Sequence, residues 1–450
     1  MTETLRWQSP AGHALHSPVS RPGVPAPLAP APVPAAAGLT TSRGAALYIG
    51  ALLGPGLLLL PGLAAAEAGP ASVLAWAGLL VLSGLFAVVF GSLGRGFPSA
   101  GGVIGYVRAG LGERASVITG WSFLAGVVAG APVVCLIGAG YVTELTGGGR
   151  LTRALIAALL LAAVIALAAG GLRSSATAQL LLVGLLLGVV VVAVAGSAGS
   201  SHAANWTPFA PHGWQAVGHA ASTLMLSFVG WEAVAPLTNR FADPARQLPR
   251  VIGIALAVTS VLYLGLAIAT VSVLGADAGV SAPLAALLRD AAGPAGTVAA
   301  AVAAVVLTLG AVNAYVTGAA EMAVELTRRA DERATAGPVT RPAPRFLAAI
   351  AGFGLVLIAL YGLGLASPAA LVAIPTTLFL AVYLGCMTSA VRVLRGPARL
   401  AAVPATVIVA VVLGYCGLAL LAPVAVIATV GAARPLAAAV RATRTRRESR

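Results

Sequence analysis

Long apolar segments separated by short polar ones run from about residue 44 almost to the end of the chain. A membrane-spanning helix needs about 20 mainly apolar residues, and windows of that length predict about twelve spans here. The predicted spans cover residues 44–66, 71–94, 115–143, 152–171, 176–198, 216–236, 249–274, 294–326, 346–365, 369–391, 400–420 and 422–439. The pattern therefore predicts an all-α integral membrane protein.

Composition supports this class. Hydrophobic residues make up 59% of the chain and charged residues 9%, with a mean hydropathy of +0.97. A soluble chain carries roughly a quarter charged residues, so most of this exterior must face lipid. Three cysteines, Cys135, Cys386 and Cys416, lie in apolar segments without CxxC spacing, which favours buried apolar side chains over a disulfide or metal site.

The two ends of the chain differ from its middle. Residues 1–41 are rich in Pro, Ala, His and Ser and lack the continuous apolar segment of a signal peptide. We interpret them as a disordered cytoplasmic tail, in which His13 and His16 are solvated. The transmembrane domain is expected over residues 42–439, followed by a basic tail at 440–450.

The basic residues predict the orientation of the spans. All 27 are arginine, and the net charge is +14. If the N-terminus is cytoplasmic, the outside loops hold only Arg150, Arg153 and Arg289, which predicts both termini inside. The charge therefore reflects membrane topology and not nucleic-acid binding. The arginines from Arg434 onward either contact anionic lipid or only set the topology.

The first predicted span contains an interruption, Gly54-Pro55-Gly56, near its middle. Proline removes a backbone donor and glycine relaxes the backbone. Non-helical backbone at membrane depth is tolerated where it is buried in protein or lines a cavity. Broken helix ends offer free N–H groups to an anion and free carbonyls to a cation, which suits a zwitterionic amino acid. The alternative is a proline kink that binds nothing.

The sixth predicted span carries a second interruption, with Gly230 beside Glu232 in an apolar segment. An ionisable group at that depth indicates a functional site. Spans one and six occupy equivalent positions in two five-helix halves, as in inverted-repeat transporters with a midplane site. Glu232 has three interpretations: it satisfies backbone donors at the break, it acts as a gate or proton acceptor, or it contacts the substrate.

Four motifs in order resemble the amino acid–polyamine–organocation (APC) superfamily. They are Gly50-x-x-x-Gly54-x-Gly56 with Pro61, residues 97–102 (FPSAGG), residues 227–232 (SFVGWE) and residues 243–250 (DPARQLPR). Asp243 stands where the last motif usually has Asn. The resemblance implies a leucine-transporter-type core of two inverted five-helix repeats with helices 1 and 6 broken, and two peripheral spans.

Within that superfamily the chain is similar to bacterial exporters of methionine and branched-chain amino acids. The similar segments are residues 98–124, Asn313-Ala314-Tyr315 and residues 383–387. The resemblance implies a multi-pass protein of the bacterial plasma membrane. It also implies that the first break holds the substrate carboxylate, that the second holds its amino group, and that Glu232 takes part in gating or proton coupling.

The implied substrate-binding residues are Leu53, Gly54, Pro55, Gly56, Phe228, Val229, Gly230, Trp231 and Asn313. Asn313 has an alternative role in a hydrogen bond between helices. Pro55 stands where many relatives have Ser, Thr or Ala, so a hydroxyl contact is missing. The chain contains no Lys, which excludes the fifth-span lysine that some relatives use for ion coupling.

The sequence therefore predicts secondary transport of neutral apolar amino acids, such as methionine, leucine, isoleucine and valine, by alternating access and in the direction of export. Proton-coupled uptake and a non-transporting amino-acid sensor are the alternatives. No Walker loop, dinucleotide fingerprint or metal motif is present, so neither an enzymatic activity nor a cofactor is expected. A channel would need a filter-like segment or a charged ring, and the sequence suggests neither.

Overall fold

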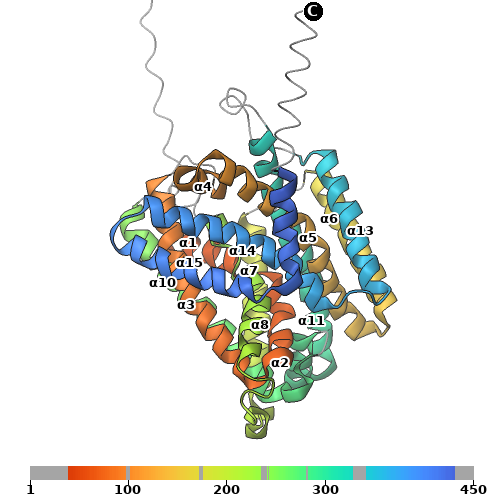
Figure 1. Ribbon diagram of the computed structural model, residues 1–450. Helices are drawn as coiled ribbons and strands as arrows, with labels where there is room; N and C mark the ends of the chain where they lie inside the picture. Colours follow the sequence, from red (N-terminus) through yellow and green to blue (C-terminus); the bar gives the residue numbers. More distant parts are fainter. Residues whose placement is uncertain are drawn as a thin grey trace, which may run out of the picture. The chain divides into compact units, whose positions relative to one another are not determined.

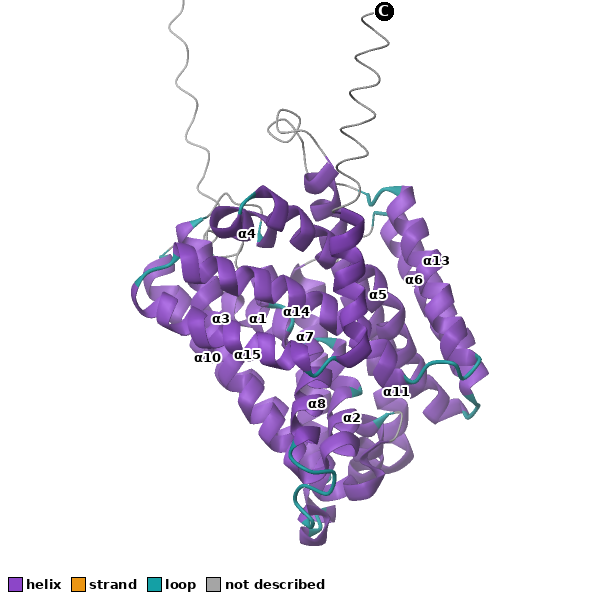
Figure 2. Cartoon of the chain, viewed as in Figure 1, coloured by secondary structure: helices purple, strands orange, loops and turns teal. Residues whose placement is uncertain are grey.

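The computed structural model, drawn in Figure 1 and Figure 2, describes residues 39–97, 102–171, 176–234, 241, 243–279, 282–327 and 341–430. Regular structure in these residues is helical, apart from one isolated bridge between Leu39 and Phe241. Most of the predicted N-terminal tail and all of the basic C-terminal tail lie outside the described residues. So do residues 98–101 of the second motif and the arginines from Arg434 onward.

Nine helical segments of the described residues are long and apolar enough to cross a membrane, which confirms the predicted all-α membrane architecture. Their main helices are α3 (Ser72–Gly96), α5 (Glu113–Thr146), α6 (Arg150–Ala169), α7 (Ala176–Gly196), α10 (Pro244–Ala269), α11 (Pro283–Thr327), α13 (Pro344–Gly362), α14 (Pro368–Val393) and α15 (Gly396–Gly414). Of the other three predicted spans, two are broken and the last is described only to Val430. The count of twelve stays a prediction.

Two features of the helices were not predicted. A short helix, α4 (Val103–Leu111), lies across one end of the bundle in Figure 1, where the sequence suggested only a loop. It packs against α14, where Ser389 Oγ donates a hydrogen bond to the carbonyl of Tyr106. Helix α11 begins eleven residues before the predicted span at 294 and is kinked at Gly293, which has a φ of 62°.

The first predicted span is broken where Gly54-Pro55-Gly56 indicated. Helix α1 (Thr41–Leu52) ends before Leu53, and Gly54 is extended, with φ −84° and ψ 166°. A short 3-10 helix, η1 (Pro55–Leu58), then leads into α2 (Leu60–Ala68). Proline at the first position of η1 has no N–H to lose there, so the chain re-enters helical structure at Pro55.

The sixth predicted span is broken at its predicted place too. Helix α8 (Gln215–Leu224) continues as the 3-10 helix η5 (Met225–Phe228), Val229 is extended, and helix α9 (Trp231–Val234) follows. These two breaks occupy the first and sixth span positions, which the inverted-repeat architecture requires.

The two breaks touch through backbone atoms at Gly230. This glycine has a φ of 147°, a conformation that L side chains rarely adopt. A Cβ atom on Gly230 would lie 2.1 Å from the carbonyl oxygen of Ala51, near the end of α1. Only glycine allows both the conformation and the approach.

Replacing Gly230 by Ala is therefore expected to destabilise the folded protein. Backbone strain of this kind costs about 1–3 kcal/mol, and the contact with Ala51 adds to it. Thermal unfolding of purified protein in detergent measures the loss. Gly78→Ala in α3 is the matched control, because a Cβ there meets no atom within 4 Å. Equal midpoints for the two variants would contradict the assigned contact.

Candidate functional site

One carbonyl at each break accepts a hydrogen bond from the same side chain, Tyr263 of α10. Its hydroxyl lies 2.7 Å from the carbonyl oxygen of Leu52 and 2.7 Å from that of Ser227, and it donates its proton to this pair. Helix ends leave such carbonyls without an intrahelical partner. Tyr263 is fully buried, and its ring packs against Trp76 and Phe228 at centroid distances of 5.0 and 5.2 Å.

The amide groups at the second break are satisfied by Glu232 and Tyr383. Glu232 Oε2 accepts a hydrogen bond from the N–H of Gly230 at 2.9 Å and another from the Tyr383 hydroxyl. The Tyr383 oxygen also lies 3.1 Å from the nitrogen of Gly230 and 3.2 Å from that of Trp231. A carboxylate in the first turn of α9 thus meets donors that the helix leaves free, which supports the first interpretation of Glu232.

The second carboxylate oxygen of Glu232 differs from the first in its hydrogen bonding. Glu232 is 5% exposed, and its Oε1 atom has no hydrogen-bond partner among the described residues. Buried polar atoms normally have one. A structural role therefore accounts for one carboxylate oxygen and leaves the other available, so the gating interpretation of Glu232 stays open.

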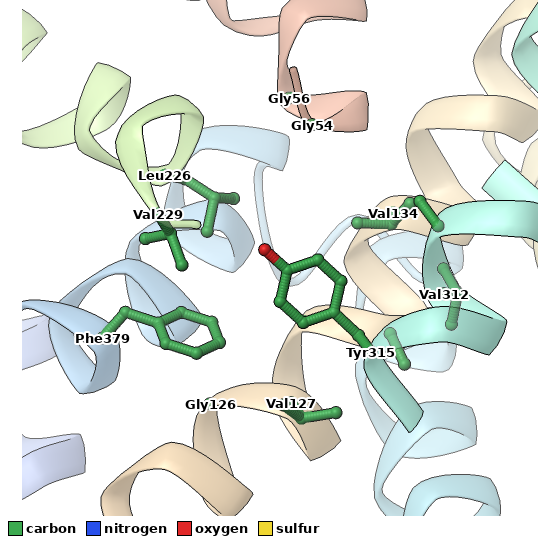
Figure 3. A pocket seen from close by; sticks show the side chains of 13 residues that line it. Gly54, Gly56, Gly126, Val127, Val134, Leu226, Val229, Val312, Tyr315 and Phe379 are labelled. Atoms are coloured by element: carbon green, nitrogen blue, oxygen red, sulfur yellow. The ribbon is translucent and has the colours of Figure 1, made fainter. Parts of the chain in front are cut away.

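A pocket lies between the breaks and helices α5, α11 and α14 (Figure 3). It holds about 580 Å³ of empty space, including the part at its mouth. The Tyr315 hydroxyl points into this space, between the second break on one side and Val134 and Val312 on the other. The lining residues are Gly54, Gly56, Gly126, Val127, Gly130, Ala131, Val134, Leu226, Val229, Ala311, Val312, Tyr315 and Phe379.

The lining is apolar and carries no charged side chain; its one polar side chain is that of Tyr315. Backbone groups add polarity at the first break. The N–H of Gly56, in the first turn of η1, makes no hydrogen bond with the described part of the chain. Pockets for small molecules typically combine apolar walls with a few polar groups that orient the ligand, and this pocket has that character.

The structure brings three predicted binding residues to the pocket wall: Gly54, Gly56 and Val229. Leu53 instead lines a neighbouring pocket between α1, α7 and α11. The two pockets share Ala311. Of Pro55 the structure describes the backbone, which begins η1.

The other predicted residues lie behind the pocket wall. Phe228 packs on Trp76 at 5.7 Å between ring centroids, and the Trp231 indole donates a hydrogen bond of 2.9 Å to Ser83 Oγ. Gly230 forms the backbone contact between the breaks. Asn313 is 5% exposed and is not among the residues that line the pocket. These positions shape the site without facing its open space.

Sequence reasoning missed the wall that α5, α11 and α14 supply. Tyr315 belongs to a quoted motif, yet nothing singled it out as a lining residue. Phe379 lies in an apolar segment without a signal. Gly126 and Gly130 are four residues apart, a spacing that brings helices close together and that could have indicated an open face of α5.

Comparison with known proteins agrees with this architecture. A family model for amino acid permeases matches residues 39–439. The chain is 34% identical over 361 residues to the uncharacterized amino acid permease YecA of Bacillus subtilis (strain 168), over 79% of this chain and 85% of that protein.

Two further relatives match about half of each chain. Identity is 35% over 220 residues to the L-methionine/branched-chain amino acid exporter YjeH of Escherichia coli (strain K12), covering 48% of this chain and 51% of that protein. It is 29% over 248 residues to the branched-chain amino acid permease BcaP of Bacillus subtilis (strain 168), covering 50% and 53%. Because the family model spans nearly the whole sequence, the chain belongs to the amino acid permease family of the APC superfamily.

Proposed function

We propose that this permease transports neutral, apolar amino acids by alternating access between its two halves, and that it works as an exporter. The observation that carries the proposal is the pocket beside the two breaks, whose side chains are aliphatic or aromatic and uncharged. Such walls accommodate a hydrophobic side chain and offer no partner to a charged one. The similarity to a methionine and branched-chain exporter supports the direction.

The breaks account for the charged end of the substrate. A carboxylate at the first break would meet the free N–H of Gly56 and the positive end of the following helix. An amino group at the second break would meet backbone carbonyls near Leu226 and Phe228, which a hydrophobic lining leaves as the available acceptors. In this arrangement Phe228, Gly230, Trp231 and Asn313 hold the shape of the walls.

The positions of the arginines indicate how the protein is oriented in the membrane. We propose a multi-pass protein of the bacterial plasma membrane with both termini in the cytoplasm, because the predicted topology puts only Arg150, Arg153 and Arg289 toward the outside. The end of the bundle that carries α4 then faces the cytoplasm, and the chain acts as a carrier and not as an enzyme.

Transport itself is tested with purified protein in lipid vesicles. Vesicles loaded with unlabelled leucine or methionine are expected to accumulate the labelled amino acid by exchange, whereas vesicles loaded with lysine or glutamate are not. Net flux with and without a proton gradient then separates export from proton-coupled uptake. Binding of leucine without any exchange would indicate a sensor and would overturn the proposal.

Gly130→Ala tests the substrate class. A Cβ on Gly130 would lie 3.6 Å from Pro375 Cβ, an ordinary contact, so the methyl group fills pocket space without a clash. We expect transport of leucine and methionine to fall about tenfold relative to alanine, the usual discrimination by one methylene-sized volume. Gly184→Ala in α7 is the control, since nothing lies within 4 Å of its Cβ. An equal loss for every substrate would contradict this role of Gly130.

Glu232→Gln tests whether Glu232 takes part in gating. The amide retains the size of the side chain but weakens the hydrogen bonds from Gly230 and Tyr383, which to a charged acceptor are each worth about 1.5–3 kcal/mol. The exchange rate is expected to fall at least roughly tenfold, since 1.4 kcal/mol corresponds to a factor of ten. Exchange at the wild-type rate over the whole pH range would remove Glu232 from both gating and proton coupling.

A further inference from the structure

A polar contact joins α2 to α8 at the end of the bundle opposite α4, where the two helices lie side by side (Figure 1). Glu67, near the end of α2, is half-buried, and its Oε2 atom accepts a hydrogen bond of 3.1 Å from Thr223 Oγ1 of α8. The Nδ1 atom of His212 lies 2.9 Å from the Glu67 carbonyl oxygen. Helix α2 follows the first break and α8 precedes the second, so this contact joins the two half-spans that lie at this end of the bundle.

No cationic side chain of the described residues lies within ion-pair distance of the Glu67 carboxylate. Thr223 is its one hydrogen-bonding partner among the described residues. A half-buried carboxylate with one neutral donor loses more hydration than that donor restores. Its charged form therefore favours an arrangement of α2 and α8 that admits water.

The other charged or titratable groups near this contact are few. His219 lies one helical turn before Thr223, with its Nδ1 3.2 Å from the Tyr415 carbonyl oxygen. Asp277, next to the end of α2, is exposed, as is His202. Tyr141 and Tyr263 donate to backbone carbonyls at the breaks. The arginines of the adjoining helices α3 and α10 lie at the opposite ends of those helices: Arg95, Arg246 and Arg250.

We propose that Glu67 is a proton-binding site that controls how readily the permease closes at this end. The inference rests on the proposed transport function. A proton arriving from the adjoining water converts the carboxylate to a neutral acid and removes the cost of burying its charge, so the closed contact between α2 and α8 becomes more stable. Under the proposed topology this water is outside the cell. An acidic exterior then speeds closure of the empty carrier after the amino acid has left.

Glu232 and Glu67 have different roles in this proposal. Glu232 lies at the break, with Oε2 held by Gly230 and Tyr383, so a change in its charge disturbs the geometry of the substrate pocket. Glu67 lies beyond the break and is reached from one side. The proton that sets the return rate therefore binds at Glu67, and Glu232 keeps the pocket in shape.

The experiment compares net efflux with exchange in lipid vesicles, changing the pH on one side at a time. During exchange the carrier returns with an amino acid bound, whereas during net efflux it returns empty. Lowering the pH from 7.5 to 5.5 on the Glu67 side is expected to raise net leucine efflux several-fold and to leave exchange unchanged. Glu67→Gln, an isosteric neutral side chain, is expected to show the fast efflux at both pH values. Glu67→Asp is expected to retain the response.

Glu144→Gln is the matched control, since Glu144 lies at the same end of the bundle but pairs with Arg289 of α11 at 3.2 Å and belongs to neither broken span. The proposal is overturned if Glu67→Gln responds to pH as the wild type does, if Glu232→Gln alone abolishes the response, or if Glu67→Gln also loses exchange. Absence of exchange in the wild-type protein would instead refute the proposed transport function.

Discussion

The structure depends on one constraint: backbone polar groups exposed by a broken helix inside a membrane must find partners within the protein. Two helices are broken, and their ends meet at Gly230 and Ala51. Tyr263 donates to one carbonyl at each break. Tyr383 and Glu232 meet the free amides of the second. Three side chains from two helices and from the break itself therefore make the irregular backbone tolerable.

That solution also creates the pocket. Side chains that satisfy the breaks lie behind them, so the open space in front is lined by glycine backbone, aliphatic side chains and Phe379. The polar groups left facing it are few, chiefly the Tyr315 hydroxyl and the Gly56 amide. A substrate with one charged end and one apolar end matches this division, which connects the folding problem of the breaks to the chemistry proposed for the site.

The lengths of the apolar segments, together with the positions of glycine and proline, predicted the helices well. Each predicted span except the last, which is described only to Val430, has a helix or a pair of helix pieces at its place, because hydrocarbon thickness sets the length of apolar sequence that a span needs. Gly54-Pro55-Gly56 located the first break, since proline and glycine act locally. The sequence missed α4, whose nine residues are too short for a spanning window. It also missed the early start of α11, since the predicted span began at residue 294, just after the kink at Gly293.

By itself, the sequence determined the membrane class, the positions of both breaks and the family motifs, because each depends on residues close together in the chain. Only the tertiary structure decided which residues face the pocket. Phe228 and Trp231 turned toward the protein interior, while Tyr315 and Phe379 arrived from helices far along the chain. It also brought Glu67 to Thr223, 156 residues away. Such contacts depend on how helices pack against one another, and the local composition of a segment does not predict that packing.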